Sequence, residues 1–304
     1  MRQSLIATAA ATAAALSLAA CAPGGSAADG SAGAEGPTVA AAFYPLEYVA
    51  RAVAGGEATV IALAQPGLEA HDLELSPSAV RDVQGADLLL YLSEFQPAVD
   101  DAVSSTGVET LDAHAIVDEH GGAGEAADDG HDHGENDPHF WLDPTLLAEY
   151  GRQVADRLGV IDPDRAADYA ANAAALEQTL TGIDEAYAAG LASCERDTIF
   201  VAHEAFGYLT ERYGIHQEGF AGINPDAEPS PARLLEIKQL VAESGATVIF
   251  TENEVSARVA DALASDVGVA TAVLSPIETV TGDDDYAAVM NRNLDQIRSA
   301  LACG

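Results

Sequence analysis

The chain has 304 residues, with 49 Asp and Glu against 13 Lys and Arg and a formal net charge of −36. This balance excludes nucleic acid as a partner, because no basic stripe could neutralise phosphates. The only lysine is Lys238, so a surface built to hold anionic lipid headgroups is also excluded. Because 48% of the residues are apolar, the chain can bury one large core or two medium ones.

The first twenty residues have the pattern of an export signal. The run from Leu5 to Ala20 carries no charge, follows Arg2, and is too short and too rich in alanine for a membrane span. Residues 18–21 (LAAC) are similar to the bacterial lipoprotein signal, in which the cysteine becomes the lipidated first residue. We predict a signal peptide over 1–20, lipidation at Cys21 and a flexible tether over 21–36. An ordinary secretory signal with an incidental cysteine is the alternative.

Export also bears on the two remaining cysteines, Cys194 and Cys303, because it places them in an oxidising compartment. A disulfide between them would close a loop of about 110 residues, which is worth at most about 4–5 kcal/mol in the chain-entropy model. Two free thiols remain the alternative.

Short β-branched runs alternate with helical stretches rich in alanine and leucine, which predicts an α/β fold with mostly parallel sheets. The runs form two groups with a long strand-free region between them. We therefore predict two lobes, 37–158 and 191–304, each with a parallel sheet flanked by helices. The predicted strands are 38–43, 58–63, 87–92, 198–202, 246–251 and 269–274.

A single long helix is predicted to join the two lobes over residues 162–190. Asp162 is suited to cap it, and Pro163 suits the first helical position. Apolar residues then recur every three or four positions, so we expect one unbroken amphipathic helix of about 28 residues, near 42 Å long. These apolar positions are Tyr169, Ala173, Leu176, Leu180, Ile183 and Tyr187.

The segment 118–137 breaks the α/β pattern because it is acidic, rich in glycine and unable to join a core. We predict a mobile surface loop there. Its histidines, His120, His131 and His133, are candidates for weak auxiliary metal binding; a solvated insertion with no such role is the alternative.

Three histidines outside this loop are the main ligand candidates: His71, His139 and His203. Their wide spacing matches no local metal motif. However, His203 directly follows a predicted strand, and all three lie in loops, where the crevice beyond parallel strands binds ligands. Three imidazoles converging there would suit a borderline-soft cation. His114 and His216 lie in contexts that favour exposed or locally hydrogen-bonded roles.

Five segments follow one another in a distinctive order: GLEAHDLELSPS (67–78), DPHFWLDP (137–144), VAHEAFGYL (201–209), GINPDAEPS (222–230) and FTENEVSARVADALASDVGV (250–269). Taken together they resemble the successive motifs of the zinc-type solute-binding proteins of bacterial ABC transporters, the ZnuA/AdcA-like group. The resemblance runs from about residue 37 to the end. It also implies that the long helix limits lobe movement, so that release involves modest tilts and loop rearrangement.

The resemblance implies a ligand set. The three histidine ligands of the family fall on His71, His139 and His203, and LSPIE (274–278) matches the variant in which a late glutamate, here Glu278, is the fourth ligand. Glu69 and Glu252 are rivals for that fourth position. In the manganese-type relatives the third position is a carboxylate and an Asp lies near the position of Ser275, so this sequence favours zinc. Glu228 resembles a structural acid rather than a ligand.

The implied function is a monomeric lipoprotein on the outer face of the cell membrane that captures Zn²⁺ between its lobes and delivers it to an ABC permease. A zinc hydrolase is disfavoured, because a fourth protein ligand closes the site and neither HExxH nor GxSxG occurs. The alternatives are a receptor for manganese or another divalent metal, and a zinc-binding surface adhesin or store.

Overall fold

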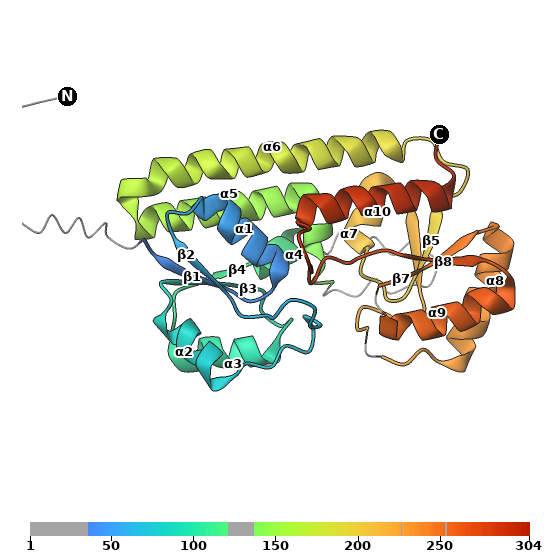
Figure 1. Ribbon diagram of the computed structural model, residues 1–304, viewed down its shortest axis with the longest axis horizontal. Coiled ribbons are helices and arrows are strands. Elements are labelled where there is room, and N and C mark those ends of the chain that lie inside the picture. Colours follow the sequence, from blue (N-terminus) through green and yellow to red (C-terminus); the bar gives the residue numbers. More distant parts are fainter. Residues whose placement is uncertain (1–35, 121–136, 226, 253) are drawn as a thin grey trace, which may run out of the picture. The chain divides into compact units, whose positions relative to one another are not determined.

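The computed structural model describes residues 36–120, 137–225, 227–252 and 254–304, which form an α/β fold with parallel strands and flanking helices (Figure 1). In the N-terminal half, four strands pair in the order β2-β1-β3-β4, all parallel. The elements are β1 (Thr38–Ala41), α1 (Tyr44–Ala54), β2 (Thr59–Ala62), α2 (Pro77–Gly85), β3 (Leu88–Tyr91), α3 (Pro97–Thr106), β4 (Thr110–Asp112), α4 (His114–His120) and α5 (Pro144–Ile161).

The C-terminal half contains two parallel ladders, β5-β6 and β7-β8, and β5 lies next to β7 (Figure 1). Helices flank these strands, and α10 is the last element. The elements are β5 (Thr198–Val201), α7 (Gly207–Tyr213), β6 (His216–Gly219), α8 (Pro231–Ser244), β7 (Val248–Thr251), α9 (Glu254–Val267), β8 (Ala270–Val273) and α10 (Tyr286–Leu301).

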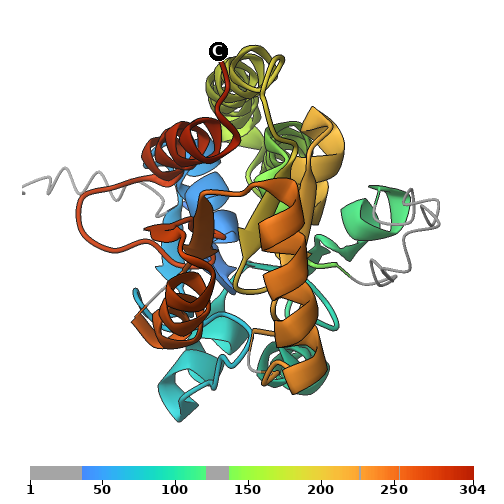
Figure 2. The ribbon, with the colours of Figure 1, turned by 90° about the vertical axis from the view of Figure 1, so that its right-hand side faces the viewer.

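The long helix α6 (Ala166–Gly190) connects the two halves and packs on α5, α1 and α10. All six apolar positions of its predicted stripe are buried, which confirms the amphipathic reading. Tyr187 at its far end donates a hydrogen bond to the backbone oxygen of Met290 at 2.8 Å. Figures 1 and 2 show α5, α6 and α10 along one side of the strands, with α2, α3 and α9 on the other.

The long helix predicted to follow Asp162 is present, but its first turn is tighter than expected. A short 3₁₀ turn, Pro163–Arg165, precedes α6. The Asp162 carboxylate makes no capping bond; it accepts hydrogen bonds from Arg165 at 2.7 Å and from Tyr169 at 3.2 Å. These side-chain bonds hold the tighter turn, so the regular helix begins three residues later than the first expected helical position.

One buried cluster continues from the first sheet through α5 and α6 to β5 and α10, and a smaller one lies among β5, β7, α8 and α9. Trp141 is fully buried between the halves. Its indole N–H donates to the oxygen of Pro276 at 2.8 Å, and its own backbone oxygen accepts from the Tyr286 hydroxyl at 2.6 Å. The segment before α5 is therefore fixed to the segment before α10, where the candidate ligands lie.

All six predicted strands are present, each somewhat shorter than expected. The sequence did not predict β4, which has only three residues, or β6, which is polar and exposes His216. The predicted loop 118–137 was placed slightly early, because α4 continues to His120.

Several sequence predictions concern residues outside the described part of the chain: the signal, Cys21 and tether, and the loop residues His131 and His133. Among the residues that the structure does describe, no helix combines the length and apolar character needed to cross a membrane. Cys194 and Cys303 are joined by a disulfide, which links the segment after α6 to the end of α10.

Candidate metal centre

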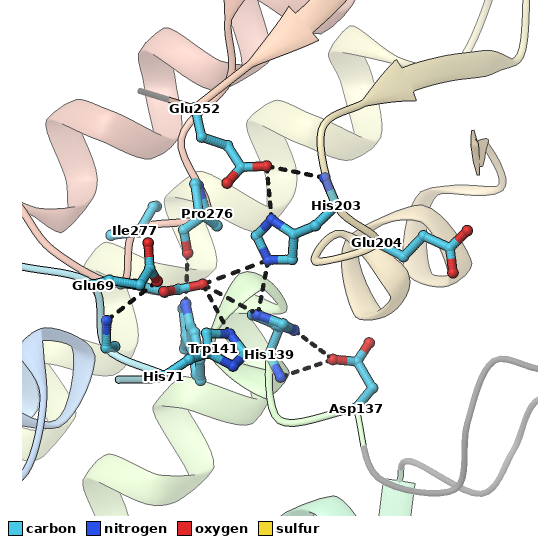
Figure 3. A network of polar contacts seen from close by, with 12 residues as sticks. Glu69, His71, Asp137, His139, Trp141, His203, Glu204, Glu252, Pro276 and Ile277 are labelled. Atoms are coloured by element: carbon cyan, nitrogen blue, oxygen red, sulfur yellow. Dashed lines mark hydrogen bonds and ion pairs between the residues drawn. The ribbon is translucent and has the colours of Figure 1, made fainter. Parts of the chain in front are cut away.

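Four side chains that are far apart in sequence meet between the two halves (Figure 3). They are His71, His139, His203 and Glu278, and one ligand atom from each lies within 4.8 Å of all the others. Glu278 Oε1 is 3.3 Å from Nε2 of His139, 3.4 Å from Nε2 of His71 and 3.6 Å from Nε2 of His203. The structure thus brings together the whole ligand set that the sequence suggested.

The order of strands and loops brings these four residues close together. His203 lies two residues after β5, and His71 and Glu278 lie in the loops that follow β2 and β8. The carboxyl ends of parallel strands commonly form ligand-binding crevices. His139 does not directly follow a described strand. It lies directly before the 3₁₀ turn Phe140–Leu142 that leads into α5.

The spacing of the four atoms suits a small tetrahedral cation. Ligands about 2.0–2.1 Å from a central ion lie roughly 3.3 Å from one another at the corners of a tetrahedron. Nε2 of His139 and Nε2 of His203 are 3.4 Å apart, close to that value. Nε2 of His71 is buried, and it lies 3.4 Å from Glu278 Oε1 without forming a hydrogen bond of good geometry. An ion at the centre would satisfy this nitrogen.

Two of the imidazoles are oriented by carboxylates on their outer side. Asp137 Oδ1 lies 2.7 Å from Nδ1 of His139, and Glu252 Oε1 lies 2.7 Å from Nδ1 of His203. A carboxylate can only accept here, so in the neutral rings Nδ1 carries the proton and Nε2 presents its lone pair to the centre. The same carboxylates also accept from the backbone N–H of the histidine that they orient.

The acidic and basic groups of the cluster shift one another's pKa values. Burial alone would lower the pKa of His203, but hydrogen bonds to Glu252 and Glu278 outweigh it and raise the pKa to about 10. Burial likewise opposes the charged form of His139, whereas Asp137 and Glu278 raise its pKa. For Glu278, burial favours the neutral acid, yet hydrogen bonds from the three imidazoles hold its pKa well below the ordinary value.

A strained turn directs Glu278 toward the imidazoles. The preceding residue, Ile277, has φ 60°, in the left-handed region that β-branched residues rarely adopt. Its side chain is fully buried, its N–H donates to Ser275 Oγ at 3.1 Å, and Trp141 holds the oxygen of Pro276. This packing maintains a conformation that costs on the order of 1–3 kcal/mol.

Comparison with known proteins identifies the family. Residues 39–300 match the family model described as "ZnuA: Zinc-uptake complex component A periplasmic". The chain belongs to this family.

The chain is also similar to individual members of the ZnuA family. "High-affinity zinc uptake system protein ZnuA" of Bacillus subtilis is 31% identical over 306 residues, 94% of each chain. "Zinc-binding lipoprotein AdcA" of Streptococcus pneumoniae is 35% identical over 272 residues, which cover 84% of this chain and 54% of AdcA. The chain therefore spans about half the length of AdcA. The Zn(II)-bound ZnuA-like domain of S. pneumoniae AdcA has a TM-score of 0.72 at 32% identity, covering 88% of this chain and 99% of that domain.

The two rivals for the fourth position lie outside this cluster of four residues. Glu252 faces the outer nitrogen of His203, so it orients that ring instead of joining the centre. Glu69 makes a hydrogen bond with Glu278; burial, followed by this bond, raises the pKa of Glu69 to about 9. Glu69 is therefore the protonated donor in that pair at neutral pH. Glu228 is exposed and takes no part.

Sequence reasoning did not find Asp137 as an orienting residue, although it lies only two positions before His139 in the DPH motif. A carboxylate that close to a buried imidazole is the signal that could have found it. His216 is exposed on β6, away from the centre, and His114 Nε2 lies 3.3 Å from Asp118 Oδ1.

A cavity of about 370 Å³ opens beside His71. Residues of both halves line it, among them Phe95, His114 and Asn224. The His71 side chain is 12% exposed, whereas the exposed fractions of His139, His203 and Glu278 are between 0% and 4%. The centre is thus reached from solvent on the His71 side.

A second, looser group lies at the end of α4. His120 Nε2 is 3.6 Å from Glu149 Oε2 of α5, and Glu119 offers a third ligand atom nearby. His120 Nε2 makes no hydrogen bond in the described part of the chain. Of the three histidines predicted as auxiliary ligands, His120 is the one that the structure describes.

Proposed function

We propose that this protein is a zinc receptor: it captures Zn²⁺ between its two halves and delivers it to an ABC permease for uptake. The observation that carries the proposal is the convergence of three imidazole nitrogens and one carboxylate oxygen at tetrahedral spacing, two of the rings already oriented by outer carboxylates. The names of the relatives, zinc-binding AdcA and the zinc uptake protein ZnuA, support the same ion.

The donor set favours zinc over the alternatives. Three neutral imidazoles and one carboxylate suit a borderline-soft ion, whereas manganese prefers more oxygen ligands and higher coordination. Four protein ligands also leave no open position for an activated water, which zinc hydrolases need. We therefore propose a binding function and no catalysis. Nickel and copper would bind such a site strongly as well, so availability has to exclude them.

The direct test is metal analysis of protein purified without added metal, followed by titration of the metal-free form with Zn²⁺ and Mn²⁺. We expect one tight zinc site and a manganese affinity weaker by orders of magnitude. Equal or tighter manganese binding would favour the manganese receptor. Tight zinc binding without any loss of zinc uptake in a deletion strain would favour the adhesin or store.

Neutralising the outer carboxylates should weaken zinc binding while the ligands stay in place. Asp137→Asn and Glu252→Gln keep the side-chain shape but remove the charge that orients His139 and His203. Loss of such a partner typically costs about 10–100-fold in metal affinity. Competition with a chromogenic chelator measures it, and Glu228→Gln, an exposed acid outside the centre, is the matched control. Unchanged affinity in both centre variants would contradict the orienting role.

Zinc affinity should rise with pH, and it should do so over a higher pH range than the range in which an ordinary histidine loses its proton. Because the pKa of His203 is about 10 in the metal-free form, the ring is protonated at neutral pH and zinc must displace that proton. One displaced proton makes the affinity fall about tenfold per pH unit below that pKa. Calorimetry in two buffers of different ionisation enthalpy counts the protons, and zinc binding at neutral pH without proton release would contradict this expectation.

The cellular setting is part of the proposal. We propose a signal peptide over 1–20, lipidation at Cys21 and a tether over 21–36, which anchor a monomer to the outer face of the membrane. The lobes 37–158 and 191–304 and the linking helix 162–190 then stand beside the permease. The lipoprotein name of the AdcA relative supports this location.

We also propose that the His-rich segment binds additional metal weakly, with His120 as its anchored ligand. Glu149 beside it supplies the oxygen that a divalent ion would share. Zinc beyond one equivalent in the titration, lost in His120→Ala, supports this role; a stoichiometry of one in both proteins contradicts it.

A further inference from the structure

Two of the four candidate ligands sit on loops from opposite halves that are bonded to each other. The N–H of Gly67, in the loop that carries His71, donates to Thr279 Oγ1 at 2.6 Å. Thr279 directly follows Glu278, so this contact joins positions 212 residues apart beside the centre.

The four ligands differ in how firmly they are held. His139 and His203 are fully buried and tied to Asp137 and Glu252. Glu278 is held by the packed turn at Ile277. In the described part of the chain, His71 has no outer carboxylate of this kind: its Nε2 lies 3.4 Å from Glu278 Oε1 without good hydrogen-bond geometry, and its ring contacts Phe95 edge-on with the ring centroids 4.7 Å apart. It is also the ligand beside the cavity.

The loop that carries His71 is long, and the buried side chains of Ala70 and Leu73 hold its middle in the core. Residues 63–76, between β2 and α2, contain no helix or strand. Gln96 of the N-terminal half holds the loop, because its buried side-chain N–H donates to the backbone oxygen of Ala70 at 2.8 Å. The Gly67 bond to Thr279 fixes it from the other half.

Gly67 has the backbone conformation that this bond requires. Its φ is +83°, which glycine adopts without strain and other residues resist. A glycine at the start of the GLEAH motif therefore lets the loop turn its N–H toward Thr279.

We propose that the Gly67–Thr279 hydrogen bond is a latch that closes the His71 loop over the bound ion, and that Thr279 is a positioning residue for zinc retention. This inference rests on the proposed zinc function. The ion leaves when the latch opens and His71 withdraws toward the cavity, while His139 and His203 stay in place. The hydroxyl of Thr279 thus sets how long the ion is held.

The latch slows zinc dissociation only if the hydrogen bond is formed more fully in the closed state than in the open one. A bond present equally in both states would not change the equilibrium between them. Loss of the latch then destabilises the closed state by the net strength of one hydrogen bond. That strength corresponds to zinc dissociation about fivefold faster.

The test compares three variants with wild type. Thr279→Val removes the acceptor, Thr279→Ser keeps it, and Thr281→Val removes a neighbouring hydroxyl that no described hydrogen bond uses. Zinc-loaded protein is mixed with excess chelator in a stopped-flow instrument. We expect about fivefold faster zinc loss for Thr279→Val, as for one hydrogen bond of ordinary strength, and rates close to wild type for the other two.

Hydrogen exchange of the segment around Gly67 gives a readout that does not need zinc. In metal-free protein, Thr279→Val should exchange faster there than Thr279→Ser, with equal melting temperatures. Equal zinc dissociation and equal exchange for Thr279→Val and wild type overturn the latch, even if wild type binds zinc normally. Failure of wild type to bind zinc overturns the proposed function instead, and the exchange comparison then still decides whether the bond holds the loop.

Discussion

Replacing His203 with alanine is expected to abolish tight zinc binding. The side chain is 1% exposed, and its Nε2 is one of four ligand atoms around the centre. Loss of an outer partner already costs about 10–100-fold in affinity, so loss of the ligand itself should cost more. Binding is measured by competition with a chelator of known affinity, together with metal analysis after dialysis.

His216→Ala is the matched control, because His216 lies in the same half on β6, is exposed and takes no part in the centre. It should bind zinc as wild type does. The melting temperature of metal-free His203→Ala must also be compared, since the change leaves Glu252 buried without its imidazole partner. A folded His203→Ala protein that keeps wild-type affinity would show that the four residues do not form the zinc site.

The second large effect concerns stability rather than binding. Replacing both Cys194 and Cys303 with serine should lower the free energy of unfolding by up to about 4–5 kcal/mol, because the disulfide closes a loop spanning 109 positions and restricts the unfolded chain. Zinc affinity should stay unchanged, since neither cysteine contacts the centre. Denaturant unfolding of the metal-free protein measures the loss.

Reduction of wild type provides the control for this prediction. Wild type treated with a reductant should unfold at the same denaturant concentration as the double serine variant, and the variant should not respond to the reductant. The hydrogen bonds beside the disulfide remain in both cases, including that from Arg196 Nε to the oxygen of Ala300 at 2.9 Å. Identical unfolding of oxidised wild type and the variant would mean that the bond contributes nothing to stability.

The fold could be predicted from sequence wherever one physical signal was strong. The buried stripe of α6 shows at 3.6-residue spacing, and β3 is a continuous apolar run because both its faces are covered. β6 lacked such a signal: its residues are HQEG, and it becomes a strand only by pairing with β5. The start of α6 differs for a local reason, since the Asp162 carboxylate bonds the side chains of Arg165 and Tyr169 instead of capping the helix.

The candidate centre was predictable in its ligands but not in its support. His71, His139, His203 and Glu278 stand in motifs that resemble a known family. Apart from Asp137, which stands two positions before His139, the surrounding residues take their roles from contacts across the chain that no local pattern contains. Thr279 meets Gly67 from 212 positions away, and Trp141 holds Pro276 from 135 positions away. Glu252 was a rival of Glu278 for the fourth position until the structure placed it behind His203.

X-ray absorption at the zinc edge of the zinc-loaded wild-type protein shows directly whether these four side chains hold the ion. We expect one zinc ion with four nitrogen and oxygen neighbours at about 2.0–2.1 Å and the outer-shell scattering of three imidazole rings. A six-coordinate ion surrounded by oxygen, or a first shell with fewer than three imidazoles, would contradict it.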